Sequence, residues 1–260
     1  GNLWLFDRDG CMRDKWEIPT VTDNNGAAIL PDTAGSILRK MQEKGIGEED
    51  IAGIGVGAPG AVDDKGTVVG GAVNLGWGVF NIPKALNAYL DVPVKAANDA
   101  NAAAFGEMWQ GGGKGYDDMV AVTLGTGVGG GIISGGKILI GATGAGGEIG
   151  HIHIDDNETE SCGCKNKGCL EQYTSATGVV RLARRRLERD DKPSSLRGVT
   201  LSAKAVFDAV KAGDEIAVEI AEQFGDCLGK GLAIVASVVN PEIFVIGGGV
   251  SKAGEILFSY

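Results

Sequence analysis

Residues 144–171, GAGGEIGHIHIDDNETESCGCKNKGCLE, contain both histidines of the chain and three of its five cysteines. The cysteines follow the pattern Cys162-x-Cys164-x4-Cys169, and His151 precedes the first of them by eleven residues. Three thiolates and one imidazole are a tetrahedral ligand set for Zn²⁺, and four protein ligands leave no position for an activated water. The stretch therefore predicts a structural zinc site.

The fourth ligand of this site is open at this point. His151 and His153 are two residues apart, and in a strand their imidazoles would share a face. Spacing alone does not choose between them. The plainer alternatives are a glycine-rich loop with unrelated thiols or a disulfide between two of the thiols. The local density of cysteines favours the metal.

The composition is that of a globular protein with 43% hydrophobic and 22% charged residues, and 260 residues are enough for two domains. The net charge of −10 argues against non-specific binding to nucleic acid or to an anionic membrane. The sequence contains no signal peptide and no apolar run of membrane-spanning length. We expect no nucleic-acid or membrane partner, and the thiols fit a reducing, cytoplasmic setting.

Apolar runs alternate with helical periodicity along the chain, which predicts an α/β fold. A hairpin is expected over residues 3–18. The continuous apolar run at 51–58 predicts a strand that is buried on both faces. Further strands are expected at 92–96, 119–124, 128–134 and 242–246, and helices at 31–45, 82–89, 100–109, 170–188 and 214–239, with Ser202 as the cap of another. Glycines at 111–115 predict a boundary between a smaller α/β lobe, residues 1–110, and a larger α/β lobe with the zinc loop, residues 111–260.

Asn98 and Asp99 stand between an expected strand and an expected helix. The positive end of the helix dipole favours an ionised carboxylate there. If a hydroxyl bound beside Asp99, this carboxylate could accept its proton during attack on a phosphoryl group, a role worth about 10²–10⁴-fold in rate. The alternative is an ordinary helix N-cap.

Residues 125–131, Gly-Thr-Gly-Val-Gly-Gly-Gly, lie between two apolar strands. Small residues let phosphate oxygens approach the backbone amides of Gly125, Thr126 and Gly127, and Thr126 adds a hydroxyl donor. The stretch is neither a dinucleotide fingerprint nor a P-loop, because it leads into a strand and lacks Gly-Lys-Ser/Thr. A plain hairpin is the alternative. A weaker signal of the same kind follows the last strand, at Gly247, Gly248 and Gly249.

Glu148, His151 and Glu171 could together bind a polyol. If zinc takes one imidazole nitrogen, the other is held at a fixed angle and can hydrogen-bond a ligand. The two glutamates would then supply acceptors. Simple surface exposure is the alternative for both.

These motifs together resemble the ROK family (repressors, open reading frames, kinases). The resemblance covers nearly the whole chain, and its zinc signature is highly specific. The matching residues are Gly150-His151, Cys162-Gly163-Cys164 and Gly168-Cys169-Leu170-Glu171 for the zinc signature, Asn98-Asp99-Ala100-Asn101 for the catalytic motif, Gly-Glu-x-Gly-His at 147–151, and the glycine loop at 125–131.

The resemblance implies an actin-like (ribonuclease H-like), two-lobed sugar kinase that transfers a phosphoryl group from ATP, with Mg²⁺, to the 6-hydroxyl of glucose. Asp99 would be the general base, and His151 would be the zinc ligand that also faces the sugar. The sugar would be bound by Asn74, Asn98, Asp99, Glu148, His151 and Glu171. The ATP phosphates would bind at Gly125, Thr126 and Gly127, with Gly247, Gly248 and Gly249 near the adenosine. A homodimer or a dimer of dimers is implied as well.

Other functions remain open at this stage. The sugar could be N-acetylmannosamine, fructose or allose, although Asn74-Leu75-Gly76-Trp77 resembles the glucose enzymes. The donor could be polyphosphate. A sugar-sensing repressor without its DNA-binding domain, or a structural zinc module, would use the same loop, but the intact Asp99 and glycine loop favour catalysis. The family's first strand, with its Asp-x-Gly-Gly-Thr phosphate loop, does not precede Leu3, and its last helices would follow Tyr260, so we expect both termini to be incomplete.

Overall fold

The computed structural model describes residues 1–260 and falls into two compact units. The first comprises Gly1–Ala103 with Ile140–Gly146, and the second comprises Ala104–Leu139 with Gly147–Tyr260. The chain passes from the first unit to the second within helix α4 (Asp99–Gln110). The lobe boundary expected after residue 110 lies at the C-terminal end of this helix and stays a prediction.

The first unit contains three separate pairs of strands. Strands β1 (Asn2–Phe6) and β2 (Met12–Glu17) form the expected antiparallel hairpin, with a β-bulge between Leu5 and Phe6. Strand β3 (Ile54–Ala58) pairs in parallel with β6 (Val94–Asn98), and β4 (Thr67–Val68) pairs in antiparallel fashion with β5 (Phe80–Asn81). Asp99, the predicted general base, directly follows β6 and is the first residue of α4. The pairing of β3 with β6 therefore positions Asp99.

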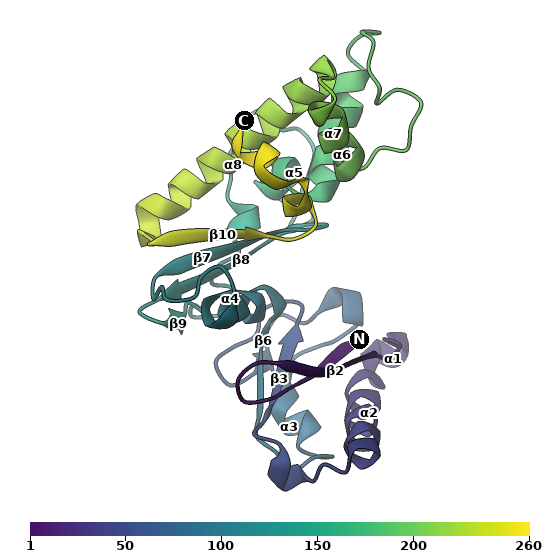
Figure 1. Cartoon of the computed structure of the whole chain (residues 1–260), viewed down its shortest axis with the longest axis vertical. Coiled ribbons are helices and arrows are strands. Elements are labelled where there is room, and N and C mark those ends of the chain that lie inside the picture. The colour runs from purple at the N-terminus through teal and green to yellow at the C-terminus, as the bar shows by residue number, and fades with distance from the viewer. The chain divides into compact units, whose positions relative to one another are not determined.

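The helices of the first unit are α1 (Asp23–Gly26), α2 (Ile29–Lys44) and α3 (Ile82–Leu86) (Figure 1). One face of α2 is apolar, and its Leu30, Ala34 and Met41 are buried in a cluster that also contains Ile82 and Leu86 of α3. Helix α2 ends at Gly45, whose φ of 66° is the left-handed conformation that closes many helices. The core of this unit therefore lies between its helices and the β3–β6 pair.

Strand β3 is less buried than its apolar sequence predicts. Ile54 and Val56 are half-buried, whereas Gly55 and Gly57 are exposed. The expectation of burial on both faces is wrong here, because the alternate positions carry glycines that present no side chain to a second layer.

The second unit contains a four-stranded sheet in the order β10, β7, β8, β9. Strand β7 (Met119–Leu124) is parallel to β10 (Ile243–Gly247) and antiparallel to β8 (Val128–Ser134), which pairs with β9 (Lys137–Ile138). Four helices gather on one face of this sheet, α5 (Glu171–Thr174), α6 (Ala176–Leu187), α7 (Ala203–Lys211) and α8 (Glu215–Val239) (Figure 1).

Strand β7, which was expected as an apolar strand, is buried on both faces. Val120, Val122 and Leu124 belong to the main core beneath α6, α7 and α8. Met119 and Ala121 point to the opposite face, into a smaller cluster that also contains Ala104. This double burial makes β7 a rigid support for the glycine loop at its carboxyl end.

The single helix expected over residues 170–188 is two helices. Ser175 is extended, with φ −81° and ψ 167°, and separates α5 from α6. Its hydroxyl accepts a hydrogen bond from the amide of Gly178, so it is the N-cap of α6. Because of this break, the orientation of α5, which begins with Glu171, is independent of the orientation of α6.

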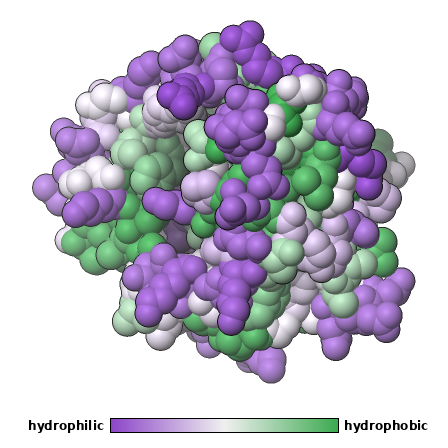
Figure 2. Space-filling view, turned by 90° about the horizontal axis from the view of Figure 1, so that it is seen from below, coloured by the Kyte–Doolittle hydropathy of each residue, from purple (hydrophilic) through white to green (hydrophobic).

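Hydrophilic residues cover much of the face shown in Figure 2, where hydrophobic residues form separate patches. None of the helices combines the length and the apolar character needed to cross a membrane.

Candidate active site and metal centre

The start of α4 in the first unit is capped by Asn98. Its Oδ1 accepts hydrogen bonds from the amides of Ala100 (2.9 Å) and Asn101 (3.1 Å), and its Nδ2 donates to the carbonyl oxygen of Gly60 (3.0 Å). The amide side chain thus satisfies free backbone donors of the helix and ties α4 to the turn after β3.

Because Asn98 is the cap, Asp99 is not needed for this purpose. Asp99 is exposed, and its carboxylate has one hydrogen bond, from the amide of Ala100 (2.9 Å). It therefore keeps spare acceptor capacity, which a general base requires.

Asn74 lies in a short 3₁₀ turn, Val73–Leu75, and its side chain is exposed. The base of this loop is closed by two backbone hydrogen bonds between Ala72 and Trp77 (2.9 and 3.1 Å). Gly60 approaches the same loop so closely that a Cβ atom at Gly60 would lie 2.8 Å from the carbonyl oxygen of Gly71. The first unit therefore brings the Asn74 loop and the start of α4 together around Gly60.

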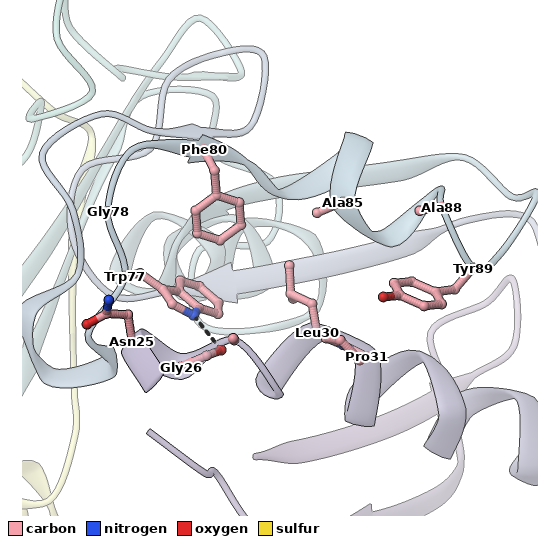
Figure 3. Close-up of a pocket in the computed structure, with 11 residues that line it drawn as sticks. Asn25, Gly26, Leu30, Pro31, Trp77, Gly78, Phe80, Ala85, Ala88 and Tyr89 are labelled. Carbon is pink, nitrogen blue, oxygen red and sulfur yellow. Dashed lines mark hydrogen bonds between the residues drawn. The ribbon is translucent and has the colours of Figure 1, made fainter. Parts of the chain in front are cut away.

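Trp77 anchors the C-terminal end of the Asn74 loop, and Figure 3 shows its indole directed toward Gly26 with Phe80 beside it. Its buried indole donates a hydrogen bond to the carbonyl oxygen of Gly26 (3.2 Å) and packs edge-on against Phe80. Trp77, Gly26 and Phe80 line a cavity of about 420 Å³, and its further lining residues include Leu30, Pro31 and Tyr89. The loop is thus fastened to the last residue of α1.

Four predicted metal ligands lie close together in the second unit. The ligand atoms of His151, Cys162, Cys164 and Cys169 all lie within 4.8 Å of one another. His151 Nδ1 is 3.7 Å from Cys162 Sγ, and the Sγ atoms of Cys164 and Cys169 are 3.6 Å apart. Zn–S bonds of about 2.3 Å in a tetrahedron require S···S edges of about 3.8 Å. The donor set and its spacing fit Zn²⁺.

Backbone pairing brings these ligands together across the sequence. The amide of Ile154 donates to the carbonyl oxygen of Gly168 (2.8 Å), and that of Leu170 donates to Ile152 (2.9 Å). Gly168 has a φ of 71°, and a Cβ atom there would lie 2.1 Å from the carbonyl oxygen of Asp155. This position accepts only glycine, which explains the Gly-Cys sequence at 168–169.

His153, the alternative ligand, points away from the sulfur atoms. Its Nδ1 lies 2.8 Å from the carbonyl oxygen of Lys167 and its Nε2 lies 2.8 Å from Asp156 Oδ1. These two acceptors raise the pKa of His153, with the Asp156 hydrogen bond as the larger cause. Of the two candidate histidines, the structure therefore places His151 in the cluster.

The loop between His151 and Cys162 contains a buried carboxylate that the sequence analysis did not single out. The side chain of Glu158 is fully buried and pairs with Arg181 and with Arg185 (2.8 Å), while the hydroxyl of Tyr173 donates to it at 2.7 Å and to Asp155 at 2.6 Å. Although burial alone would raise the pKa of Glu158, hydrogen bonds from Arg185 and other donors hold it well below its usual value. Glu158 thereby locks the metal loop onto α6.

Glu171 connects the metal cluster to the glycine loop. Its Oε2 accepts a hydrogen bond from the amide of Val128 (2.9 Å), directly after the 125–127 turn. Its Oε1 lies 3.5 Å from Cys162 Sγ. A metal-bound thiolate has no proton to donate, so Oε1 would then be free to accept a hydrogen bond from a ligand.

The two glycine loops predicted to bind phosphate lie side by side. Strands β7 and β10 are parallel, so their carboxyl ends share one edge of the sheet, with Gly247 opposite Thr123. Gly248 has a φ of 94°, and a Cβ atom there would lie 2.5 Å from the carbonyl oxygen of Leu124. Thr126 is exposed at the tip of the turn. Ligands of open α/β sheets bind at such carboxyl ends.

Glu148 precedes the 3₁₀ turn Ile149–His151 and is exposed, and its carbonyl oxygen accepts a hydrogen bond from the amide of His151 (3.1 Å). The predicted residues thus form two groups. Asn74, Asn98 and Asp99 lie in the first unit. Glu148, His151, Glu171, the cysteines and both glycine loops lie in the second.

Comparison with known proteins gives one consistent family. The ROK family profile matches residues 2–259. A glucokinase of Halalkalibacterium halodurans is 43% identical over 254 residues, covering 95% of this chain and 76% of that protein. The crystal structure of a ROK-family glucokinase from Streptomyces griseus in complex with glucose and AMPPNP is similar with a TM-score of 0.76 and 34% identity, covering 98% of this chain and 82% of that chain.

A structure with a different described role is similar as well. The crystal structure of a ROK-family transcriptional regulator, a homologue of the E. coli MLC protein, has a TM-score of 0.83 and 29% identity, covering 99% of this chain and 65% of that chain. These similarities confirm the expected sugar-kinase fold, and the fold is therefore shared by kinases and regulators.

Proposed function

The chain belongs to the ROK family, and we propose that it is a glucokinase that transfers a phosphoryl group from ATP to the 6-hydroxyl of glucose. Its 43% identity to a glucokinase over 95% of the chain supports the substrate. The observation that carries the catalytic role is the exposed carboxylate of Asp99, which Asn98 relieves of capping α4.

In this mechanism Asp99 accepts the proton of the sugar 6-hydroxyl while O6 attacks the γ-phosphorus of ATP, and ADP leaves with the electrons of the broken P–O bond. The sugar hydroxyls are bound by Asn74, Asn98, Asp99, Glu148, His151 and Glu171. Mg²⁺ bound with ATP would neutralise phosphate charge, so the contribution of the protein is mainly to position the two substrates. Exclusion of water around the sugar limits hydrolysis of ATP.

The nucleotide is held at the carboxyl edge of the β10–β7 sheet. The amides of Gly125, Thr126 and Gly127 and the Thr126 hydroxyl bind the phosphates, and Gly247, Gly248 and Gly249 lie near the adenosine. The close packing of Gly248 on Leu124 supports this assignment, because it brings both loops to one edge.

The metal ligands are His151, Cys162, Cys164 and Cys169, and the metal is a structural Zn²⁺. Burial raises the pKa of the Cys169 thiol to about 12. Zn²⁺ binds the thiolate, so binding of the metal would release a proton from this group. A cytoplasmic location is part of the proposal, and the free cysteines support it because thiols persist in a reducing compartment. A homodimer or a dimer of dimers is part of the proposal and is checked by light scattering.

The competing proposal is a sugar sensor without kinase activity, which the similarity to a regulator favours. The two are separated by measuring sugar-dependent ADP release with MgATP on glucose, N-acetylmannosamine and fructose in parallel. Turnover on glucose that exceeds turnover on the other two sugars is expected. Binding of a sugar without ADP release from any of them would contradict the kinase.

A further inference from the structure

Among the predicted sugar ligands, Glu171 is the one whose side chain is hydrogen-bonded to the glycine loop. It is half-buried and is the first residue of α5. Its Oε2 accepts a hydrogen bond from the amide of Val128 (2.9 Å), which begins β8 directly after the turn 125–127. The side chain of Glu171 therefore belongs to both candidate substrate sites of the second unit.

Gly127 leaves the space that this carboxylate occupies. A Cβ atom at Gly127 would lie 2.2 Å from Oε2 and 3.2 Å from Cδ of Glu171. The backbone itself does not require glycine here, because the φ of Gly127 lies outside the left-handed region. The close approach of Glu171, rather than backbone strain, accounts for a glycine at this position.

The same turn is held at its other end by the start of α6. The amide of Ala176 donates to the carbonyl oxygen of Gly125 (2.8 Å), and this bond involves backbone atoms only. The contact at Val128, in contrast, is made by a side chain that can rotate. The geometry of the turn therefore depends on where the carboxylate of Glu171 lies.

The second oxygen of this carboxylate faces the metal cluster, where Oε1 lies 3.5 Å from Cys162 Sγ. With three thiolates and a neutral imidazole, a Zn²⁺ site keeps a net negative charge, which repels Oε1. A carboxylate only accepts hydrogen bonds, so Oε1 gains from a hydroxyl donor. A sugar hydroxyl bound there would hold Glu171 in the orientation in which Oε2 meets Val128.

We propose that Glu171 is a positioning residue that couples the two substrates. A hexose hydroxyl on Oε1 steadies the hydrogen bond from Val128 to Oε2, and this bond preorganises the amides of Thr126 and Gly127 for the donor phosphates. Coupling between two sites is reciprocal, so the nucleotide raises the affinity for the hexose by the same factor. This inference rests on the proposed kinase function and deepens it by connecting its two sites.

The first test compares Gly127→Ala with the control Gly125→Ala by calorimetric titration with glucose in the absence of nucleotide. The methyl group at 127 would displace Oε2, whereas a Cβ atom at Gly125 meets nothing closer than 3.8 Å. Gly127→Ala is expected to raise the Kd for glucose by about tenfold, and Gly125→Ala should leave it within about twofold of the wild type. Equal Kd values in the two variants would overturn the inference.

The second test uses Glu171→Gln and does not depend on whether the turn tolerates a side chain. The control is Glu148→Gln, at the other predicted sugar-binding glutamate, whose side chain is exposed. The Kd for AMPPNP is measured without glucose and with saturating glucose. Glucose should tighten AMPPNP binding by about tenfold in the wild type and in Glu148→Gln, but by less than about twofold in Glu171→Gln.

Equal tightening in Glu171→Gln and Glu148→Gln would overturn the inference, and so would a wild-type protein in which glucose leaves the Kd for AMPPNP unchanged. Failure of the kinase proposal is a separate result, because it is defined by the absence of ADP release with MgATP. A wild-type protein that releases no ADP but keeps the coupled binding contradicts the kinase and supports the role of Glu171.

Discussion

The two units hold their candidate residues by different means. In the first unit, Asn74, Asn98 and Asp99 are positioned by backbone turns and by the capping of α4, and no buried charge lies beside them. In the second unit, His151 and Glu171 depend on a cysteine cluster and on the buried Glu158. The first arrangement needs only its hydrogen bonds, whereas the second depends on a metal and on ionised groups.

This difference predicts different sensitivities for the two units. Removal of the metal or protonation of carboxylates should loosen the second unit and leave the first largely intact. Loss of a single side chain in the first unit should change the chemistry with little change in stability. The following substitutions test this contrast.

The largest effect is expected for Cys164→Ser. It removes one of four ligands of a site whose apparent binding energy for structural Zn²⁺ is about 10–16 kcal/mol near pH 7. The variant should lose its zinc, as measured by metal analysis, and proteases should cut the second unit before the first. Cys11→Ser, at an exposed cysteine of the first unit, is the control and should keep the metal. Full zinc content in Cys164→Ser would refute the assignment.

Asp99→Asn should lower turnover by about 10²–10⁴-fold, because the amide cannot accept the hydroxyl proton. The melting temperature should change little, since Asn98 rather than Asp99 caps α4, and glucose binding should stay measurable because the other sugar-binding residues remain. Steady-state kinetics and calorimetry measure both quantities. Asp91→Asn, at another exposed aspartate of the first unit, provides the matched control. Near-normal turnover in Asp99→Asn would remove Asp99 from the role of base.

Glu158→Gln should lower the free energy of unfolding of the second unit by about 3–5 kcal/mol, because two arginines lose a buried carboxylate partner. Denaturant unfolding followed by hydrogen exchange assigns the loss to one unit. Glu222→Gln changes an exposed glutamate of α8 without a partner and should have no measurable effect. Equal free energies of unfolding for the two variants would show that the Glu158 ion pairs do not stabilise the second unit.

Acid should narrow the difference in stability between the wild type and Glu158→Gln. The pKa of Glu158 is lowered in the folded state, so its stabilisation is complete above the unfolded value of about 4.3 and is lost as the pH falls toward the folded value. Comparison of the two proteins separates this effect from metal release, which acts on both. A difference that stays constant from pH 6 to pH 3 would contradict the lowered pKa.

Local patterns predicted much of this molecule. The apolar run at 119–124 indicated strand β7, and Ser202 indicated the start of α7, where its hydroxyl accepts a hydrogen bond from the amide of Ala205 (3.0 Å). The cysteine spacing indicated a metal cluster because its ligands are close in sequence. These predictions depend on interactions within a few residues or on one strong compositional signal.

Other features depend on contacts that the sequence does not specify. The two histidines near the cysteines became distinguishable only through Lys167 and Asp156, which hold His153 away from the sulfur atoms. Glu158 is 23 and 27 residues from its arginine partners. The spacing of Arg181 and Arg185 on one helix face was the available signal for an acidic partner. The break at Ser175 was missed because helical periodicity continues across it.

The most direct test of the proposed reaction is ADP release with MgATP and either glucose or 6-deoxyglucose. We expect rapid ADP release with glucose, glucose 6-phosphate as the product, and only background hydrolysis with 6-deoxyglucose, although both sugars should bind. Equal ADP release with the two sugars would show that the 6-hydroxyl is not the acceptor. Absence of release with glucose itself would contradict the assignment of Asp99 as the general base and of the two glycine loops as the nucleotide site.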